Sequence, residues 1–307
     1  MDALANNLQV LFQGLALGSI YALVALGFVL IIRATNVVNF AQGDFAMLGA
    51  YAMVLFMAGV PGNPDLHIPA VDIHFPYGVA IILALLLMAG VGVVFNYGVY
   101  YPLRNRPFLP VLISTLGASI FLQNTVLAVF NPQPRPLEKL IDVEGVTVGG
   151  VFLDSQYLVI LAFTVLAVAF QYFFFEHTLL GKKLQATSQD KDMARLLGIP
   201  VTLMIIITFV YSAVLGGMAG ILVAPILFVS IGMGSTIALK AFAATIIGGF
   251  GDVAGAIVGG LIIGVIESFA AYYISVPYKD AYAFLALFLV LLFRPQGIFG
   301  EKVSEKA

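Results

Sequence analysis

The sequence alternates between long apolar runs and short polar ones. A helix needs about 20 apolar residues to cross the hydrocarbon core of a bilayer, and runs near this length recur along the chain. We predict nine spanning helices, over residues 8–32, 40–57, 77–101, 108–130, 157–175, 201–222, 237–250, 253–274 and 282–293. The pattern therefore predicts an all-α polytopic membrane protein.

Two segments depart from this pattern. Residues 225–250 are apolar but contain Gly232, Gly234 and Ser235, so we expect a broken or re-entrant element before the seventh span. Eight or ten spanning helices are the alternatives to nine. Residues 143–150, Val-Glu-Gly-Val-Thr-Val-Gly-Gly, predict a small β-hairpin.

Small residues recur at close spacing within two predicted spans. They are Gly216, Gly217 and Gly220 in the sixth span, and Gly255, Gly259, Gly260 and Gly264 in the eighth. Such spacings let helices approach closely where the bilayer supplies no hydrophobic drive. We therefore expect a compact bundle.

The composition strengthens the membrane assignment. The chain is 61% hydrophobic and 10% charged, with a mean hydropathy of +1.05. Soluble domains carry about 25% charged residues, so this chain could not cover a water-exposed surface. We treat residues 1–307 as a single transmembrane domain.

The first residues need a separate interpretation. Residues 8–14, LQVLFQG, resemble a viral protease cleavage site. We interpret them as native sequence because they continue without a break into the first span. We do not expect a cleaved secretory signal, because no basic segment precedes the apolar run.

Basic residues are unevenly distributed among the polar segments. If the amino terminus lies outside and the carboxyl terminus in the cytoplasm, the cytoplasmic segments hold Arg33, Arg104, Arg106, Lys182, Lys183, Lys191, Arg195, Arg294, Lys302 and Lys306. The outer segments and their borders then hold Arg135, Lys139, Lys240 and Lys279. This bias follows the positive-inside rule and places residues 181–200 in the cytoplasm.

Several kinds of chemistry are excluded by what the sequence lacks. There is no cysteine, and His67, His74 and His177 are too scattered for a histidine-based metal site. The chain has no phosphate-binding GxxxxGK[ST] motif and no basic run that would follow a nucleic acid. We expect no cofactor, no ATP site on this chain and no nucleic-acid partner. An intramembrane enzyme is disfavoured, because no catalytic set of side chains is present.

Residues 181–200, GKKLQATSQDKDMARLLGIP, are strongly polar and lie between two predicted spans. Ser188 or Asp190 can cap a short helix. Asp192 then lies where the helix dipole favours an anion, and Gly198 and Pro200 end the helix.

This short helix has one apolar face. Met193, Leu196 and Leu197 are spaced to lie together on it. Because the helix is too short to span a bilayer, it must pack against something. It either lies on the inner surface of its own bundle or docks in a groove of a partner protein.

Ionisable residues inside membrane spans are costly and are candidates for function. Lys240 in the seventh span and Glu267 in the eighth are both expected in the outer leaflet. They either satisfy each other as an ion pair or line the outer mouth of a substrate path. Gln171 in the fifth span either binds a substrate or joins two helices.

Other polar residues are also candidates for the path. Gln42 and Asp44, at the inner end of the second span, face either the path or the cytoplasmic side, and Asn39 is placed to cap that helix. Gln123 and Asn124 are adjacent, so only one of them can face the bundle interior. Either could hydrogen-bond a passing substrate.

Five segments carry a family resemblance: residues 14–31 (GLALGSIYALVALGFVLI), 39–51 (NFAQGDFAMLGAY), 184–199 (LQATSQDKDMARLLGI), 250–268 (FGDVAGAIVGGLIIGVIES) and 291–300 (LLFRPQGIFG). In this order they resemble the LivH-type inner-membrane permease subunits of ABC importers for branched-chain amino acids. The resemblance covers almost the whole chain. A small departure is Lys191, where members of that family often carry proline.

The resemblance implies that residues 176–200 are a cytoplasmic coupling loop, whose helix fits a cleft on a separate ATPase subunit and moves with it. The implied coupling residues are Gln185, Gln189, Asp190, Asp192, Met193, Arg195, Leu196 and Gly198. Met193 and Leu196 would fill the cleft, while Arg195 and the aspartates would fix the orientation.

The resemblance also implies partners and a function. The chain would be the non-catalytic permease of an ATP-driven, binding-protein-dependent importer in a bacterial inner membrane. Two ABC ATPase subunits would bind the ATP, a second permease would be of the LivM type, and a periplasmic or lipid-anchored protein would bind the solute.

Two questions remain open at this point. Branched-chain amino acids are the usual cargo of this family, but other amino acids, short amides and urea use similar permeases. The alternative function is a stand-alone secondary transporter or channel for small neutral solutes. It would need ion-coupling carboxylates near the midplane, for which Glu267 is the candidate.

Overall fold

The structure is a computed structural model that describes residues 2–63, 69–141, 145–148 and 151–300. Its helices are α1 (Asp2–Thr35), α2 (Gln42–Ala58), α3 (Tyr77–Phe95), α4 (Phe108–Phe130), α5 (Ser155–His177), α6 (Leu179–Gln189), α7 (Lys191–Leu196), α8 (Val201–Leu227), α9 (Met233–Gly248), α10 (Val253–Tyr273) and α11 (Lys279–Phe293). A π-helical turn, η1 (Asn96–Tyr100), and a 3-10 turn, η2 (Tyr101–Leu103), follow α3.

The helices confirm the predicted all-α fold, and each predicted span coincides with one helix. Within the described residues, six helices are long and apolar enough to cross a membrane: Leu4–Thr35, Tyr77–Leu103, Phe108–Phe130, Ser155–His177, Val201–Leu227 and Val253–Tyr273. The other three, α2, α9 and α11, have 17, 16 and 15 residues. Nine crossings therefore stay a prediction.

The predicted interruption between residues 225 and 250 lies between α8 and α9. Phe228 turns the chain with a φ of 58°, and α9 begins directly after Gly232. The seventh span thus starts earlier than residue 237. Gly234 lies in the first turn of α9, where it packs against the backbone of Gly43 in α2. Close helix packing explains this glycine better than a break does.

A small hairpin is confirmed, but its second strand lies beyond the predicted residues 143–150. Strands β1 (Val146–Val148) and β2 (Val151–Leu153) pair antiparallel, with Thr147 opposite Phe152. Residues 143, 144, 149 and 150 of the predicted hairpin lie outside the described residues.

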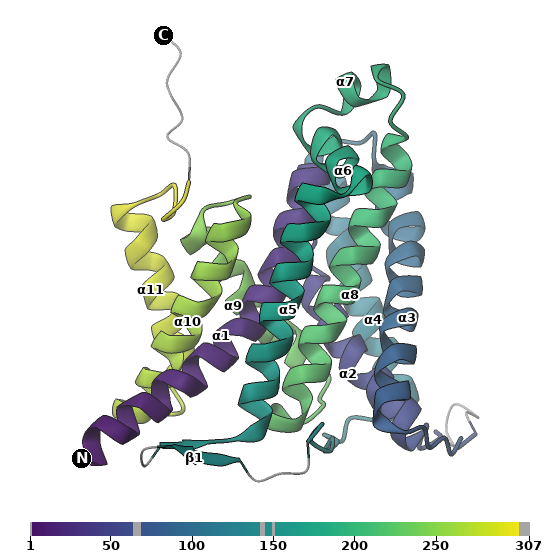
Figure 1. Ribbon diagram of the computed structural model, residues 1–307. Helices are drawn as coiled ribbons and strands as arrows, with labels where there is room; N and C mark the ends of the chain where they lie inside the picture. The colour runs from purple at the N-terminus through teal and green to yellow at the C-terminus, as the bar shows by residue number, and fades with distance from the viewer. Residues whose placement is uncertain (1, 64–68, 142–144, 149–150, 301–307) are drawn as a thin grey trace.

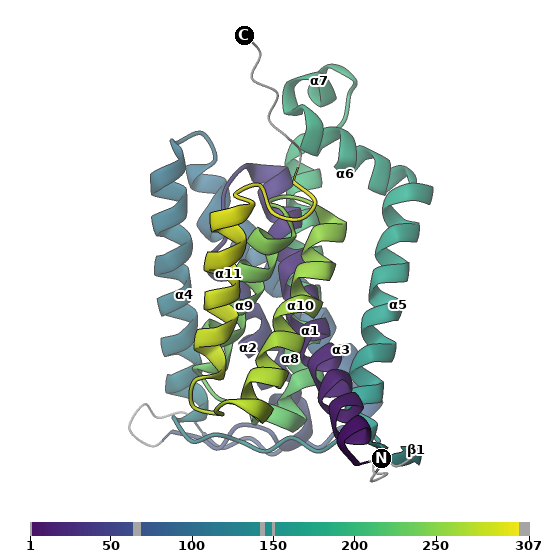
Figure 2. The same ribbon diagram turned by 90° about the vertical axis from the view of Figure 1, so that its left-hand side faces the viewer.

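Helix α1 forms the centre of the bundle (Figures 1 and 2). It contacts α5, α8, α9 and α10, and its side chains between Ile20 and Leu26 are buried. Helices α3, α4 and α5 lie at the periphery and expose large apolar side chains such as Leu86, Ile120 and Leu166. In a bilayer these side chains face lipid at no hydrophobic cost.

The small residues predicted to mediate packing lie where the helices approach most closely. A Cβ on Gly264 would overlap the backbone nitrogen of Gly18, and a Cβ on Gly260 would lie 2.6 Å from the backbone nitrogen of Ala22. These contacts join α10 to α1 along their length. The compact bundle is thus held by close contact between backbones.

Several of the basic residues assigned to the cytoplasm lie at one end of the bundle. α1 begins at one end, whereas α6, α7 and the end of α11 lie at the other (Figure 1). Arg33 lines a cavity together with residues of α6, Arg104 lines a cleft together with residues of α7, and Arg294 directly follows α11. Lys302 and Lys306 lie outside the described residues.

Lys240 corrects the charge analysis. It was counted with the outer segments, but it is buried within α9 and paired with Glu267. A lysine neutralised inside the bundle does not sense the charge difference between the two sides, so it carries no information on orientation.

The contact between α1 and α10 generates a prediction. Gly264→Ala should lower the free energy of unfolding by about 1–3 kcal/mol, as expected for overpacking a filled contact. The measurement is the midpoint of thermal unfolding in detergent, which size-exclusion chromatography monitors after heating. Gly117→Ala in α4 is the matched control, because a Cβ there meets no atom within 4 Å. Equal midpoints for the two variants would contradict the packing argument.

Candidate functional site

Helices α6 and α7 project from one end of the bundle, and α6 runs laterally from the end of α5 toward α7 (Figures 1 and 2). The sequence analysis missed α6. Thr178 caps it by accepting a hydrogen bond from the Gly181 amide at 3.0 Å. Gly181 packs directly on the backbone of Phe174, and Leu184 and Thr187 are buried on the same side. The sequence signals for α6 are the capping Thr178 and the spacing of the buried residues Gly181, Leu184 and Thr187.

Helix α7 confirms the predicted short helix. The carboxylate of Asp190 accepts hydrogen bonds from the amides of Asp192 and Met193, both at 2.9 Å. The cap is therefore Asp190, whereas the Ser188 hydroxyl donates to the carbonyl of Gln185. Gly198, with a φ of 76°, ends the segment in a left-handed conformation.

The apolar face of α7 is exposed. Met193, Leu196 and Leu197 are 56%, 82% and 72% exposed. The helix contacts its own bundle through Ala194, which is buried against Ile205 and its neighbours. Of the two alternatives for this face, packing on its own bundle is therefore wrong, because the three side chains point away from it.

The implied coupling residues divide into two groups. Gln189, Asp190, Asp192, Met193, Arg195, Leu196 and Gly198 are exposed. Gln185 is half-buried, and its amide donates to the Glu176 carboxylate at 3.3 Å. Arg195 pairs with Asp192 at 2.9 Å on the surface of α7.

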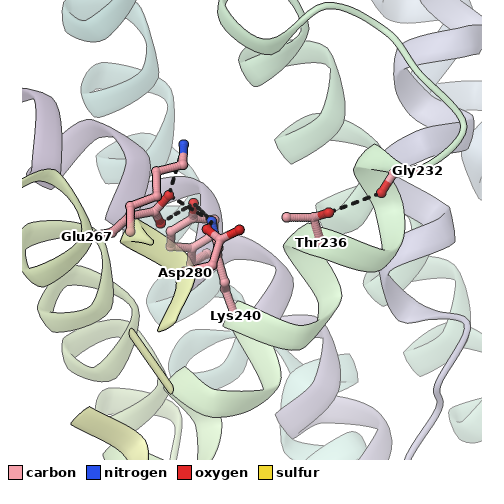
Figure 3. A network of polar contacts seen from close by, with 7 residues as sticks. Gly232, Thr236, Lys240, Glu267 and Asp280 are labelled. Atoms are coloured by element: carbon pink, nitrogen blue, oxygen red, sulfur yellow. Dashed lines mark hydrogen bonds and ion pairs between the residues drawn. The ribbon is translucent and has the colours of Figure 1, made fainter. Parts of the chain in front are cut away.

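A second site is an ionic cluster between α1, α9, α10 and α11, in which Lys240 and Glu267 are buried whereas Lys279 and Asp280 are partly exposed. Lys240 Nζ lies 2.7 Å from Glu267 Oε1 and 2.7 Å from Asp280 Oδ1, the latter without hydrogen-bond alignment (Figure 3). Lys279 Nζ lies 3.4 Å from Glu267 Oε1, and the Tyr21 hydroxyl donates to Glu267 Oε2 at 2.7 Å. Two ammonium groups and two carboxylates thus compensate each other.

The cluster confirms that Lys240 and Glu267 form an ion pair. That they also line a substrate path stays a prediction. The sequence analysis missed Tyr21, Lys279 and Asp280 as members. The adjacent Lys279 and Asp280 at the start of the last helix were the available signal, since buried charges require partners.

Gln42 joins three helices. The Ser212 hydroxyl of α8 donates to Gln42 Oε1 at 2.7 Å and lies 3.0 Å from the Gly27 carbonyl oxygen of α1. Gln42 Nε2 donates to the Ser212 carbonyl at 3.3 Å. Because both ends of the amide are used, Gln42 acts here in helix packing. Asn39 Oδ1 accepts a hydrogen bond from the Ala41 amide, but α2 is capped by Ala41 without any side-chain hydrogen bond, so the predicted capping of α2 by Asn39 is wrong.

Asp44 is buried and accepts a hydrogen bond from Gln123 Nε2 at 2.9 Å, which links α2 to α4. The neighbouring Asn124 is exposed, and its amide donates to the Ile120 carbonyl of its own helix. As predicted, only one of the two adjacent side chains faces the bundle interior.

A cavity of about 390 Å³ lies below α6, between α5 and the helices α1, α8 and α10. Its walls are apolar at Leu30, Val168 and Ile257, and Arg33 and Glu176 also line it. Gln171 lines it as well and is buried with both amide atoms lacking a hydrogen-bond partner within the described residues. Gln171 therefore does not join two helices by hydrogen bonds.

Comparisons with known proteins agree on one kind of relative. Residues 10–293 match the family model described as branched-chain amino acid transport system / permease component. The chain is 33% identical to the high-affinity branched-chain amino acid transport system permease protein LivH of Salmonella typhimurium, over 97% of each chain. It is 33% identical to the permease protein BraD of Pseudomonas aeruginosa, over 100% of each chain.

A more distant relative is a probable branched-chain amino acid transport permease protein LivH of Methanocaldococcus jannaschii. It is 27% identical, over 92% of this chain and 89% of that protein. No solved structure matches the chain significantly.

The ionic cluster generates a prediction. Glu267→Gln leaves Lys240 and Lys279 facing Asp280 alone, and breaking a buried pair costs about 3–5 kcal/mol. The thermal midpoint should fall strongly. The double variant Lys240→Met/Glu267→Gln should recover part of the loss, because it restores equal numbers of opposite charges.

The control for this experiment is Lys139→Met, which breaks the partly exposed pair between Lys139 and Asp154. Such pairs contribute about 0–1 kcal/mol, so little change is expected. The effect of Lys240→Met alone is measured as well. If the losses of stability in Lys240→Met and Glu267→Gln simply add in the double variant, the two charges do not interact.

Proposed function

Because the chain belongs to the family of branched-chain amino acid transport permeases, we propose that it is the translocating subunit of an ATP-driven importer for these amino acids. In this proposal two ABC ATPase subunits bind the ATP, one of them docks on α7, and a LivM-type chain is the second permease. A periplasmic or lipid-anchored protein delivers the solute. The α6–α7 end faces the cytoplasm of a bacterium, and α1 begins on the outside.

The exposed apolar face of α7 is the observation that carries the coupling part of this proposal. Two large apolar side chains on a helix of six residues, together with Leu197 directly after it, cost free energy when they face water. At the end of a bundle, beyond the membrane spans, lipid cannot cover them. A complementary groove on an ATPase subunit would remove Met193, Leu196 and Leu197 from water.

The connections of α7 support its role in transmitting movement. On one side α6 leads to α5, and the Thr178 hydroxyl donates to the Phe174 carbonyl at 2.6 Å across that junction. On the other side residues 198–200 lead directly into α8. A displacement of α7 by closing ATPase subunits would therefore act on two different helices of the bundle.

The alternative function, a stand-alone secondary transporter or channel, gains less support. It requires a carboxylate available to couple an ion. Glu267 is already engaged by Lys240, Lys279 and Tyr21. It would also leave the exposed face of α7 without a partner.

The coupling proposal predicts the phenotype of Arg195→Glu/Leu196→Asp. This variant places one carboxylate on the apolar face of α7 and reverses the charge of the neighbouring Arg195, so binding-protein-dependent uptake of labelled leucine into proteoliposomes should fall at least tenfold. Losing one well-packed apolar contact and reversing one charge at an interface cost about 2 kcal/mol or more. The chain itself should stay folded, because both side chains are exposed.

Lys183→Glu is the matched control, since Lys183 is also exposed and its charge is also reversed, but it lies in α6 and not on α7. Its uptake should equal that of the unmodified chain. Competition by isoleucine, valine, short amides and urea in the same assay defines the cargo. Uptake in the absence of ATP or of the ATPase subunits would overturn the proposed function.

A further inference from the structure

A small cleft lies on the opposite side of α7 from its exposed apolar face. It has a volume of about 70 Å³ and is formed by the end of α3 with η1 and η2, by α7 and by the start of α8. Its polar lining includes Asn96, Arg104, Asn105, Lys191 and Arg195, while no aspartate or glutamate lines it. The cleft thus presents three cationic side chains and no anionic one.

Two of these cations lack an acidic partner. Within the described residues, neither Arg104 nor Lys191 forms an ion pair, whereas Arg195 pairs with Asp192 outside the cleft lining. The Arg104 guanidinium lies 3.7 Å from the centre of the Tyr101 ring and donates to the Tyr101 carbonyl at 3.0 Å. The stacked guanidinium is thereby held in place.

Lys191 is partly desolvated. Burial, and then the neighbouring charge of Arg195, lower the pKa of its ammonium group, and the charge of Asp192 opposes this shift only in part. A cation in this situation is stabilised by an anion that enters the cleft.

Asn96 adds a buried donor. Its residue is 1% exposed, and its Nδ2 atom has no hydrogen-bond partner within the described residues. Asn96 begins the π-helical turn η1, a feature that often marks functional positions in helices. The unpaired amide lies beside the same cleft as the cations.

The depth of the cleft identifies the kind of anion. The apolar span Tyr77–Leu103 ends here, and the span Val201–Leu227 begins here, so in a bilayer crossed by these two helices the cleft would lie near the headgroups. Tyr97, an exposed aromatic residue of the interface, precedes it. Toward the membrane interior, α3 exposes Val94 and Leu87, which can contact acyl chains.

We propose that this cleft binds the phosphate of an anionic phospholipid from the leaflet at the α7 end of the protein. The lipid chains would lie along the exposed face of α3. Basic pockets between membrane helices at the cytoplasmic side recognise such headgroups. Because Lys191 belongs to α7 and Arg104 to the segment after α3, the lipid ties the two segments together. This inference does not depend on the proposed transport function.

The test is direct lipid binding to the purified full-length chain, measured by native mass spectrometry. Phosphatidylglycerol should bind more tightly than phosphatidylcholine with the same acyl chains. Arg104→Gln/Lys191→Gln should weaken the binding of phosphatidylglycerol roughly tenfold or more, because each basic residue near a membrane surface contributes about one kilocalorie per mole. Arg104→Lys/Lys191→Arg keeps both charges and should retain binding.

Arg106→Gln/Lys183→Gln is the matched control. It removes two exposed charges at the same end of the protein, and neither residue lines the cleft. Equal losses in this variant and in Arg104→Gln/Lys191→Gln would overturn the site. Inorganic phosphate that binds as tightly as the lipid would overturn the assignment to a phospholipid. Displacement of phosphatidylglycerol by bound ATPase subunits would also overturn the assignment to a phospholipid, since an acidic protein side chain would then be the occupant.

Discussion

The close antiparallel contact between α1 and α10 is the constraint on which the rest of the structure depends. Glycines at positions 18, 260 and 264 bring the two backbones together, and this closeness replaces the hydrophobic drive that a bilayer does not provide. The contact also fixes Tyr21 of α1 and Glu267 of α10 within hydrogen-bond distance. Lys240 and Asp280 then add α9 and α11 to the same cluster. The close packing and the buried ion pair thus depend on the same alignment of α1 against α10.

The apolar pattern predicted where helices occur better than how they are arranged. Apolar length reports directly on the thickness of a bilayer, so each predicted span matched a helix. Hydropathy does not report on burial, however. The spans Leu4–Thr35 and Tyr77–Leu103 have similar mean hydropathies of 2.6 and 2.8, but 89% of the apolar stretch is buried in the first and 28% in the second. Lipid and protein interior are equally apolar. The glycine spacings of α10 indicated the arrangement instead, because only small residues permit the close contact between α1 and α10.

The same reasoning explains which parts of the site were predictable. Lys240 and Glu267 were paired from sequence because an isolated charge within a membrane is costly. Tyr21 gave no signal, since a tyrosine in an apolar helix has many roles. The capping of α7 by Asp190 followed from local chemistry, whereas α6 was missed because it depends on a tertiary contact of Gly181 with the α5 backbone. Family resemblance named coupling residues but could not separate Gln185, which faces Glu176, from those exposed on α7.

The two connections of α7 differ in how deeply the helices they join are buried, and we infer from this difference how a displacement would spread. In α8, 67% of the apolar stretch is buried, whereas in α5 only 22% is buried. α8 is also joined to α1 and α2 through Ser212, and a phospholipid in the basic cleft would tie α7 to the junction of α3 and α8. α5 contacts the core mainly through α1, α6 and α8, beside the cavity that contains the unpaired Gln171. A force on α7 would therefore move α5 more readily than α8 and change the volume of that cavity first.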